Sequence, residues 1–287
     1  MAATIRPAVA SDASPCARIM YDAFAGIAEN HRFPPDFPSE EAAAQLIEAF
    51  IAHPSIYGVV AERNGVVVGS NFLSEGDPIR GVGPITVGPA AQGSGIGRRL
   101  MNAVLQRAKD AVGVRLVQDS FNMRSVALYA SLGFEVKEPL LLMRGKPKSA
   151  LEPGFAVRPL AHDDIEACAS LCARVHGFAR SSELGDALKM FSPFVVTRDG
   201  RVTGYLSAAT FWQANHGVAE AEEDMRALIS GAAAASSEPV AFLLPTRQAG
   251  LFRWCLSEGI RAVKPMTLMA LGDYSEPKGS HFPSVFY

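Results

Sequence analysis

The pattern of hydrophobic and polar positions predicts alternating strands and helices in the first half of the chain. Ile96, Leu100, Val104 and Ala108 recur at helical spacing, which predicts an amphipathic helix over residues 95–112. Further helices are expected at residues 12–25, after the N-cap Ser39, and at residues 123–132. Short β-rich runs predict strands at residues 4–7, 56–61, 66–73, 84–87, 114–118, 134–137 and 140–144. The fold class is therefore α+β (mixed α/β), with a mostly antiparallel sheet and one β-α-β unit.

The second half of the chain repeats the plan of the first half. Four pairs of segments recur in the same order: Ile5-Arg6-Pro7 with Val157-Arg158-Pro159, Asn64-Gly65 with Asp199-Gly200, Gly69 with Gly204, and Gly133-Phe134 with Gly259-Ile260. Asn-Gly and Asp-Gly both favour the positive φ of a two-residue hairpin turn. A polar segment rich in Pro and Gly, residues 145–154, separates the repeats. We therefore predict two domains, residues 1–147 and 154–287.

Composition narrows the class of protein. Of the 287 residues 48% are hydrophobic, which is enough for a sizeable core, and the net charge is −2. This charge argues against nucleic acid or an anionic membrane as the main partner. The start of the chain does not resemble a signal peptide, and no apolar stretch is long enough to span a bilayer. The four cysteines, Cys16, Cys168, Cys172 and Cys255, fit a reducing cytoplasm, and we expect buried thiols and no metal.

The segment that carries chemistry is a glycine-rich turn between a strand and a helix. It reads Ile85-Thr-Val-Gly-Pro-Ala-Ala-Gln-Gly-Ser-Gly-Ile-Gly-Arg-Arg-Leu100. Such a turn exposes backbone N–H groups at the positive end of the helix dipole, where a phosphate is favoured. Arg98 and Arg99 in the first helical turn suggest an anion from outside. A P-loop would need Lys at Ser94, and a dinucleotide fingerprint would need a different glycine spacing, so both are excluded.

The residues from Val87 to Gly97, V-x-P-x-x-Q-G-x-G-I-G, resemble the acetyl-CoA signature of the GNAT acetyltransferase superfamily. A second family element follows as Asn122-x-x-Ser125-x-x-Leu128-Tyr129-x-x-x-Gly133-Phe134. The family usually has Ala where this chain has Ser125. The resemblance implies two tandem GNAT-like domains. In each we expect a central sheet with a splayed pair of parallel strands, in the first domain Pro84–Val87 and Val114–Gln118, and flanking helices.

The resemblance also implies acetyl-CoA as co-substrate and the residues that hold it. These are Thr86, Val87, Gln92, Gly93, Ser94, Gly95, Ile96, Gly97, Arg98, Asn122 and Ser125. The pantetheine arm would lie between the splayed strands, and the amides from Gln92 to Arg98 would bind the pyrophosphate. Tyr129 would lie near the sulfur.

The chemistry of the reaction suggests roles for these groups. An amine attacks the thioester carbonyl, which the backbone N–H of Val87 would polarise, and Tyr129 would act as general acid toward the thiolate. Glu75 is the first choice for the general base, with Asp77, Asp119 and His31 as alternatives. The loop from His31 to Pro38 is expected at the acceptor pocket.

The second repeat lacks the glycine cluster. Alignment places Gln248 opposite Asn122 and Cys255 opposite Tyr129, while Glu220, Glu222, Glu223 and Asp224 crowd the equivalent helix start. Carboxylates there would repel a pyrophosphate, so the second domain is expected to bind no CoA. The aromatic end of the chain, residues 281–287, is expected to pack on its own domain or to line the acceptor cleft.

The sequence therefore predicts an N-acetyltransferase that acts on a primary amine, of a small molecule or of a protein. It is expected to be a cytoplasmic monomer or homodimer that binds neither nucleic acid nor membrane. A non-catalytic acyl-CoA-binding sensor and an interaction protein are the alternatives.

Overall fold

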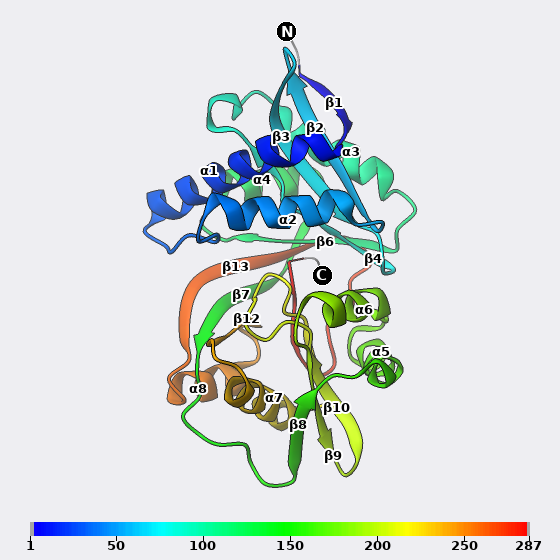
Figure 1. Ribbon diagram of the computed structural model, residues 1–287, viewed down its shortest axis with the longest axis vertical. Helices are drawn as coiled ribbons and strands as arrows, with labels where there is room; N and C mark the ends of the chain where they lie inside the picture. Colours follow the sequence, from blue (N-terminus) through cyan, green and yellow to red (C-terminus); the bar gives the residue numbers. More distant parts are fainter. Residues whose placement is uncertain (1–2, 286–287) are drawn as a thin grey trace.

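The structure, a computed structural model, describes residues 3–285. Figure 1 shows two units, one above the other, with β13 and β7 between them. The elements of the first half are β1 (Thr4–Pro7), α1 (Ala13–His31), α2 (Glu40–Ala52), β2 (Ile56–Arg63), β3 (Val66–Ser74), β4 (Ile79–Val82), β5 (Thr86–Val87), α3 (Ile96–Arg107), β6 (Gly113–Asp119), α4 (Met123–Ser131) and β7 (Glu135–Gly145). Short 3-10 helices η1 (Ala10–Asp12) and η2 (Pro89–Ala91) precede α1 and α3.

The second half has the same order of elements. These are β8 (Phe155–Pro159), η3 (His162–Asp164), α5 (Ile165–His176), α6 (Ser181–Met190), β9 (Phe194–Arg198), β10 (Arg201–Leu206), β11 (Gly217–Ala219), α7 (Glu222–Ala235), β12 (Val240–Pro245), α8 (Ala249–Ser257), β13 (Arg261–Gly272) and β14 (Ser280–Phe282). No described helix, from residue 3 to residue 285, has the length and apolar character needed to cross a membrane.

The repeat seen in the sequence has a structural counterpart in the first turn of each unit. Arg6 Nη1 lies 2.7 Å from Asp12 Oδ2, and Arg158 Nη1 lies 2.6 Å from Asp164 Oδ2. Each aspartate also accepts a backbone hydrogen bond three residues upstream. The two hairpin turns agree as well, because both residues of Asn64-Gly65 and of Asp199-Gly200 have positive φ. The prediction of two similar units is confirmed.

The main sheet runs through both units because they exchange equivalent strands. Its order is β1-β2-β3-β4-β6-β13-β7-β12, so β13 of the second half pairs with β6 of the first half, and β7 pairs with β12. β7 is one continuous strand, whereas the sequence predicted two. The exchange brings Lys264 and Met266 of β13 next to the end of β6, which decides the composition of the site described below.

A parallel pair is present in the first unit, although with a different strand than predicted. The partner of β6 is β4, with Ile79 opposite Gly113 and Gly81 opposite Arg115. Residues Thr86 and Val87 instead form β5, which pairs with β3. After Gly81 the chain therefore turns away from β6 and pairs with β3 instead. This divergence is the splay that the resemblance implied. The five-stranded sheet β14-β11-β10-β9-β8 is wholly antiparallel over its described strands, so among the described residues the hydrogen-bonded parallel pair occurs in the first unit.

Helices cover both faces of the sheet in the first unit. α1 and α2 pack on one face, where Met20, Ile47 and Phe72 are fully buried. α3 and α4 pack on the other face around Leu100 and Val104. Figure 1 shows α1 and α2 in front of β2 and β3, with α3 behind them. In the second unit α5 and α6 enclose one core and α7 and α8 the other. This layering fixes the start of α3 and of α4 at one edge of the sheet.

Candidate active site

A cavity of about 850 Å³ lies where the first unit meets the second. It is bounded by α1, the loop before α2, β5 and the turn after it, the end of β6, the first turns of α4, and a loop of the second unit around Trp212. The predicted site residues on its wall are Thr86, Val87, Gln92, Gly93, Gly95, Ile96, Gly97, Arg98, Asn122, Ser125 and Tyr129. Ser94 and Glu75 are absent from this lining.

The glycine-rich turn presents a run of amides that the protein itself does not use. Within residues 3–285, none of the six backbone N–H groups from Gly93 to Arg98 donates to a protein acceptor, whereas Arg99 N donates to Gly95 O at 3.2 Å. Helix α3 has no side-chain cap and no acidic residue in its first turn. Gly93 and Gly95 have φ of 76° and 79°, and a Cβ on either would meet no atom within 4 Å. The turn is therefore shaped to accept an anion from outside.

Cationic side chains flank this turn. Arg98 lines the cavity and donates to Ser131 Oγ at 2.7 Å. Arg124, which the sequence analysis did not single out, also lines it and donates to Gln92 Oε1 at 3.0 Å. Arg99 instead binds the carbonyl of Ala3, so only one of the two adjacent arginines faces the cavity. Arg124 lies inside the second motif, two positions after Asn122, and this place was a signal that could have identified it.

The start of α4 places Asn122, Ser125 and Tyr129 along one wall. Asn122 Oδ1 accepts from Ser125 N at 3.2 Å and so caps the helix. The side chain of Tyr129 is buried, and desolvation raises its pKa to about 12, with a further contribution from the charge of Asp119. Tyr129 thus carries its proton at neutral pH and is a hydrogen-bond donor toward a group in the cavity.

Glu75, the first choice for the general base from the sequence, is not among the carboxylates at the other end of the cavity. Glu75 lies outside the cavity, and its two carboxylate oxygens accept from Nε and Nη2 of Arg107 at 2.9 and 3.1 Å. Asp77, a weaker alternative, caps α6 by accepting from Ser182 N and Glu183 N. Asp119 does line the cavity. The place of Glu75 therefore does not support a general base there, because its carboxylate lies outside the cavity.

Asp119 belongs to a buried cluster that joins the two units. Lys264 Nζ lies 2.7 Å from Asp119 Oδ1 and 2.6 Å from Asp36 Oδ1. Asp36 lies in the predicted acceptor loop and also lines the cavity. Burial raises the pKa of Asp36, while Lys264 opposes this shift. Asp36 and Lys264 were not predicted, because they are 228 positions apart in the chain and meet only through the strand exchange.

Aromatic and apolar side chains complete the wall. Phe24, His31, Phe37, Phe121, Trp212, Met266 and Val285 line the cavity. His31 and Phe33 both contact the ring of Phe121, at centroid distances of 4.8 and 4.5 Å. Residues 281–287 were expected to pack on their own domain or to line the acceptor cleft, and the described part of this segment does both. Phe282 packs in the core of the second unit, and Val285 lines the cavity. Phe286 and Tyr287 lie outside the described residues.

The equivalent place in the second unit is filled by the chain itself. β14 pairs with β11 and also contacts β12. Gln248 and Asn122 are the N-cap residues of α8 and α4, and Cys255 and Tyr129 are each the seventh residue of those helices, as the alignment predicted. Gln248 donates from Nε2 to His281 O at 2.7 Å and accepts from Ser280 Oγ and His281 N. The side chain that matches Asn122 therefore binds the backbone of β14.

The start of α7 shows no counterpart of the glycine-rich turn. Asp224 accepts from Ala221 N at 3.2 Å and is 3.2 Å from Arg198 Nη2. The carboxylate of Glu222 lies against the start of α8, where a Cβ on Gly250 would come within 2.4 Å of Glu222 Oε2. Acidic side chains of the protein thus occupy this helix start, as the sequence analysis expected.

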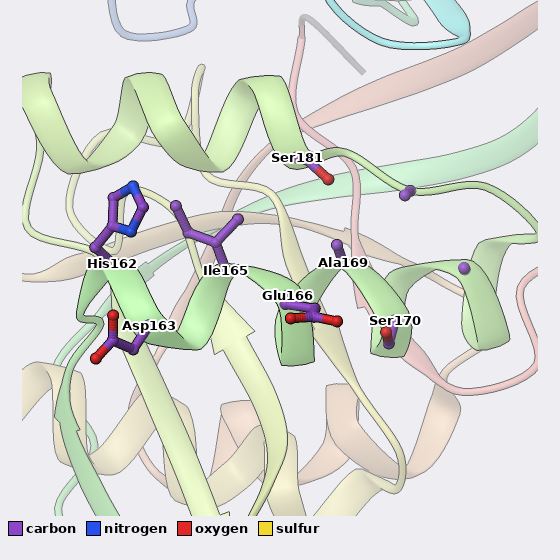
Figure 2. Close-up of a pocket in the computed structure, with 9 residues that line it drawn as sticks. His162, Asp163, Ile165, Glu166, Ala169, Ser170 and Ser181 are labelled. Carbon is purple, nitrogen blue, oxygen red and sulfur yellow. The ribbon is translucent and has the colours of Figure 1, made fainter.

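Two other features lie outside this cavity. A hollow of about 670 Å³ on the second unit is lined by η3, α5 and the start of α6, and Figure 2 shows Asp163, Glu166 and Ser170 along it. It contains none of the predicted site residues. All four cysteines are buried thiols, as expected of Cys168, Cys172 and Cys255. Cys172 lies with His176 and His216 in a group whose ligand atoms are within 4.8 Å of one another. These two histidines were not predicted from the sequence.

Comparisons with known proteins agree with this geometry. Residues 23–134 match the model of the acetyltransferase (GNAT) family. The search of curated proteins gave no match. Among solved structures, a protein from Pyrococcus horikoshii designated an acetyltransferase is 16% identical, with a TM-score of 0.78 over 100% of this chain and 95% of the other. A GCN5-related N-acetyltransferase from Sphaerobacter thermophilus is 14% identical, with a TM-score of 0.64 over 96% of both chains.

A third solved structure bears on the arrangement of the two units. A tandem GNAT protein of the clavulanic acid biosynthesis pathway is 14% identical, with a TM-score of 0.60 over 95% of this chain and 100% of the other. At this identity the likeness concerns the fold alone, and it extends over both units. Residues 23–134 therefore match the acetyltransferase (GNAT) family, and the fold of the two units together is similar to that of a tandem GNAT protein.

Proposed function

We propose that the protein is an N-acetyltransferase that transfers the acetyl group of acetyl-CoA to a primary amine. The observation that carries this proposal is the run of six amides from Gly93 to Arg98 without protein acceptors at the start of α3. Two cations, Arg98 and Arg124, lie on the same wall. Amides at a helix N-terminus together with arginines form a binding site for a diphosphate.

The residues of the first unit fit the rest of the cofactor. Backbone groups of Thr86 and Val87 would bind the pantetheine arm where the chain diverges from β6, and Asn122 and Ser125 would contact it from the start of α4. Acetyl-CoA would supply the thioester carbonyl and the leaving thiolate. No metal is needed for this reaction.

The transfer is a direct attack of the amine on the carbonyl carbon. The C–N bond forms, the C–S bond breaks, and the amine loses a proton. The backbone N–H of Val87 would stabilise the developing oxyanion, and Tyr129 would give its proton to the thiolate. Asp119, which lines the cavity and influences the pKa of Tyr129, would accept the amine proton directly or through water. We propose Asp119 for this role in place of Glu75, because Glu75 is bonded to Arg107 outside the cavity.

For the second unit, residues 154–287, we propose that it binds no CoA. In the first unit the cofactor arm would lie between the diverging strands, and in the second unit β14 lies against both β11 and β12 at that place. The hydrogen bonds of Gln248 to Ser280 and His281 take the place of a contact to the cofactor. This unit instead supplies Trp212, Met266 and Val285 to the wall of the first unit's cavity.

The experiment is a thiol-release assay on the purified protein with acetyl-CoA and a panel of primary amines, with acetylated product identified by mass spectrometry. Amine-dependent release with one acetyl group gained per thiol supports the proposal. Tight binding of acetyl-CoA without amine-dependent release would instead assign the protein to acyl-CoA-binding sensors and contradict the catalytic role.

A further inference from the structure

The end of the cavity away from the glycine-rich turn has an excess of negative charge. Asp36 and Asp119 line it, and both carboxylates lie within ion-pair distance of the single ammonium of Lys264, at 2.6 and 2.7 Å. The exposed fractions of the three side chains are 8%, 7% and 2%, so water screens their charges weakly. When both carboxylates are ionised, the two of them facing one ammonium leave one net negative charge in this cluster, which we call the anionic pole.

The geometry turns the carboxylates, and not the ammonium, toward the cavity. Lys264 is absent from the lining residues and lies behind Asp36 and Asp119, with its Nζ 5.4 Å from the centre of the Trp212 ring. A ligand that enters therefore meets carboxylates. Asp22 of α1 also lines the cavity. The arginines that line the cavity, Arg98 and Arg124, flank the glycine-rich turn at the opposite end.

The walls beside the anionic pole are apolar. Phe24, Phe37, Phe121 and Trp212 line the cavity there, together with Met266 and Val285. Phe24 and Phe37 pack edge to face, with centroids 5.6 Å apart. A ligand that satisfies both features has a cationic head for the carboxylates and an apolar body for the aromatic rings, which also attract cations.

We propose that the anionic pole and the aromatic wall select an acceptor that enters as a cation, has an apolar body and carries no carboxylate next to its amine. This rests on the proposed function for the transfer step, although the binding preference can be measured without it. A free α-amino acid would bring its carboxylate to within a few bonds of the amine, next to the excess negative charge and far from the arginines. Repulsion between like charges in a poorly screened site then excludes it.

The test uses pairs of amines that differ by one carboxylate: phenethylamine with phenylalanine, and cadaverine with lysine. Calorimetry on the wild-type protein saturated with CoA measures the Kd of each. We expect the amine without the carboxylate to bind at least about tenfold more tightly in each pair. The kcat/KM for thiol release with acetyl-CoA should show the same preference.

A single substitution tests how much the negative charge of the anionic pole contributes to amine binding. Asp36→Asn leaves Lys264 paired with Asp119, so the cluster becomes neutral without leaving a charge unpaired. It should weaken phenethylamine binding about tenfold and leave the Kd of CoA unchanged. Asp163→Asn, which removes a carboxylate from the separate hollow in Figure 2, is the matched control and should change neither Kd.

The outcomes separate this proposal from the proposed function. Equal affinity for the two members of each pair, no measurable binding of either amine, or an Asp36→Asn protein that binds phenethylamine as wild type does would overturn it. Selective binding without acetyl transfer supports the pole and contradicts the catalytic role. Acetylation of both members at equal kcat/KM supports the catalytic role and contradicts the pole. The measurements on paired amines need only the wild-type protein, so they decide even where a variant does not fold.

Discussion

Gln248 donates from Nε2 to the carbonyl oxygen of His281 at 2.7 Å, so the N-cap residue of α8 holds the backbone of β14. Its Oε1 accepts from Ser280 Oγ and from His281 N. Asn122 has the equivalent place before α4, where the structure leaves a cavity and no strand. Two related positions have thus diverged, one toward the wall of a ligand site and the other toward internal packing.

Replacing Gln248 by Ala should destabilise the second unit, because it leaves partly buried backbone and hydroxyl groups of β14 without their partner. We expect a loss of about 2 kcal/mol in the free energy of unfolding, measured by urea denaturation. Asn122→Ala removes a cap from α4 and should cost less stability, about 1 kcal/mol, but should weaken CoA binding. If Gln248→Ala also weakened CoA binding as strongly as Asn122→Ala, the assignment of separate roles would be wrong.

Tyr129→Phe should lower kcat and leave the Kd of acetyl-CoA within about twofold of wild type. Loss of a general acid typically costs 10²- to 10⁴-fold, so we expect a decrease of about 10²-fold or more. Phe retains the ring that packs with Phe134 in the T-shaped contact at 6.3 Å, so stability should change little. Single-turnover kinetics on both proteins would check this, and an unchanged kcat would leave Tyr129 as a packing residue.

Gly95→Ala tests the turn, with Gly200→Ala as its control. Gly95 and Gly200 have φ of 79° and 74°, and a Cβ at either position would contact no atom within 4 Å. Both substitutions therefore introduce the same backbone strain, about 1 kcal/mol. Only Gly95 lies on the cavity, so only Gly95→Ala should weaken CoA binding, by about tenfold, since the methyl group stands where the anion approaches. Equal effects of both variants on CoA affinity would contradict a phosphate site at this turn.

Because three histidines of the second unit are buried, we expect the free energy of unfolding to fall in mild acid. Burial lowers the pKa of His176 to about 3, with Arg180 contributing, and also holds the pKa values of His216 and His281 well below the usual range. Below pH 6.5 the unfolded chain binds protons that the folded histidines do not bind, so stability falls as pH decreases. Burial raises the pKa of Glu183 to about 7, which acts in the opposite direction between pH 7 and 4.5.

Comparing the free energy of unfolding of the wild type with that of a variant lacking His176 measures the contribution of this one histidine. Each buried neutral histidine should contribute a slope of about 1.4 kcal/mol per pH unit below pH 6.5. His176→Gln removes one titrating group, so its free energy of unfolding should fall less steeply by that amount between pH 6 and 5. Parallel curves in urea denaturation at several pH values would show that His176 does not carry this dependence.

Local features of the site could be predicted from the sequence, whereas its composition at the acceptor end could not. The turn and α3 follow from glycines and helical periodicity within one stretch of chain, and they lie where predicted. Met266 lines the cavity, and Lys264 contacts Asp119 behind it, because β13, and not β7, pairs with β6. The segments Lys137–Met143 and Val263–Met269 carry similar patterns of apolar residues. Either could pair with β6, and no local signal distinguishes the exchanged arrangement from the unexchanged one.

The position of Glu75 outside the cavity has a similar origin. Its position after β3 was read from chain order, but its carboxylate is drawn to Arg107 at the end of α3, 32 residues away. Asp119 was a secondary candidate, and its burial against Lys264 depends on the same strand exchange. A carboxylate's place in the chain does not show which cation will neutralise it.

The amides from Gly93 to Arg98, which have no acceptor among the described residues, and the internal strand β14 of the second unit together determine where CoA binds. Titration calorimetry of the full chain with CoA measures both at once. We predict one equivalent bound in wild type and about tenfold weaker binding in Gly95→Ala. No detectable heat in wild type, or a stoichiometry of two, would contradict the assignment of the cofactor site to the first unit alone.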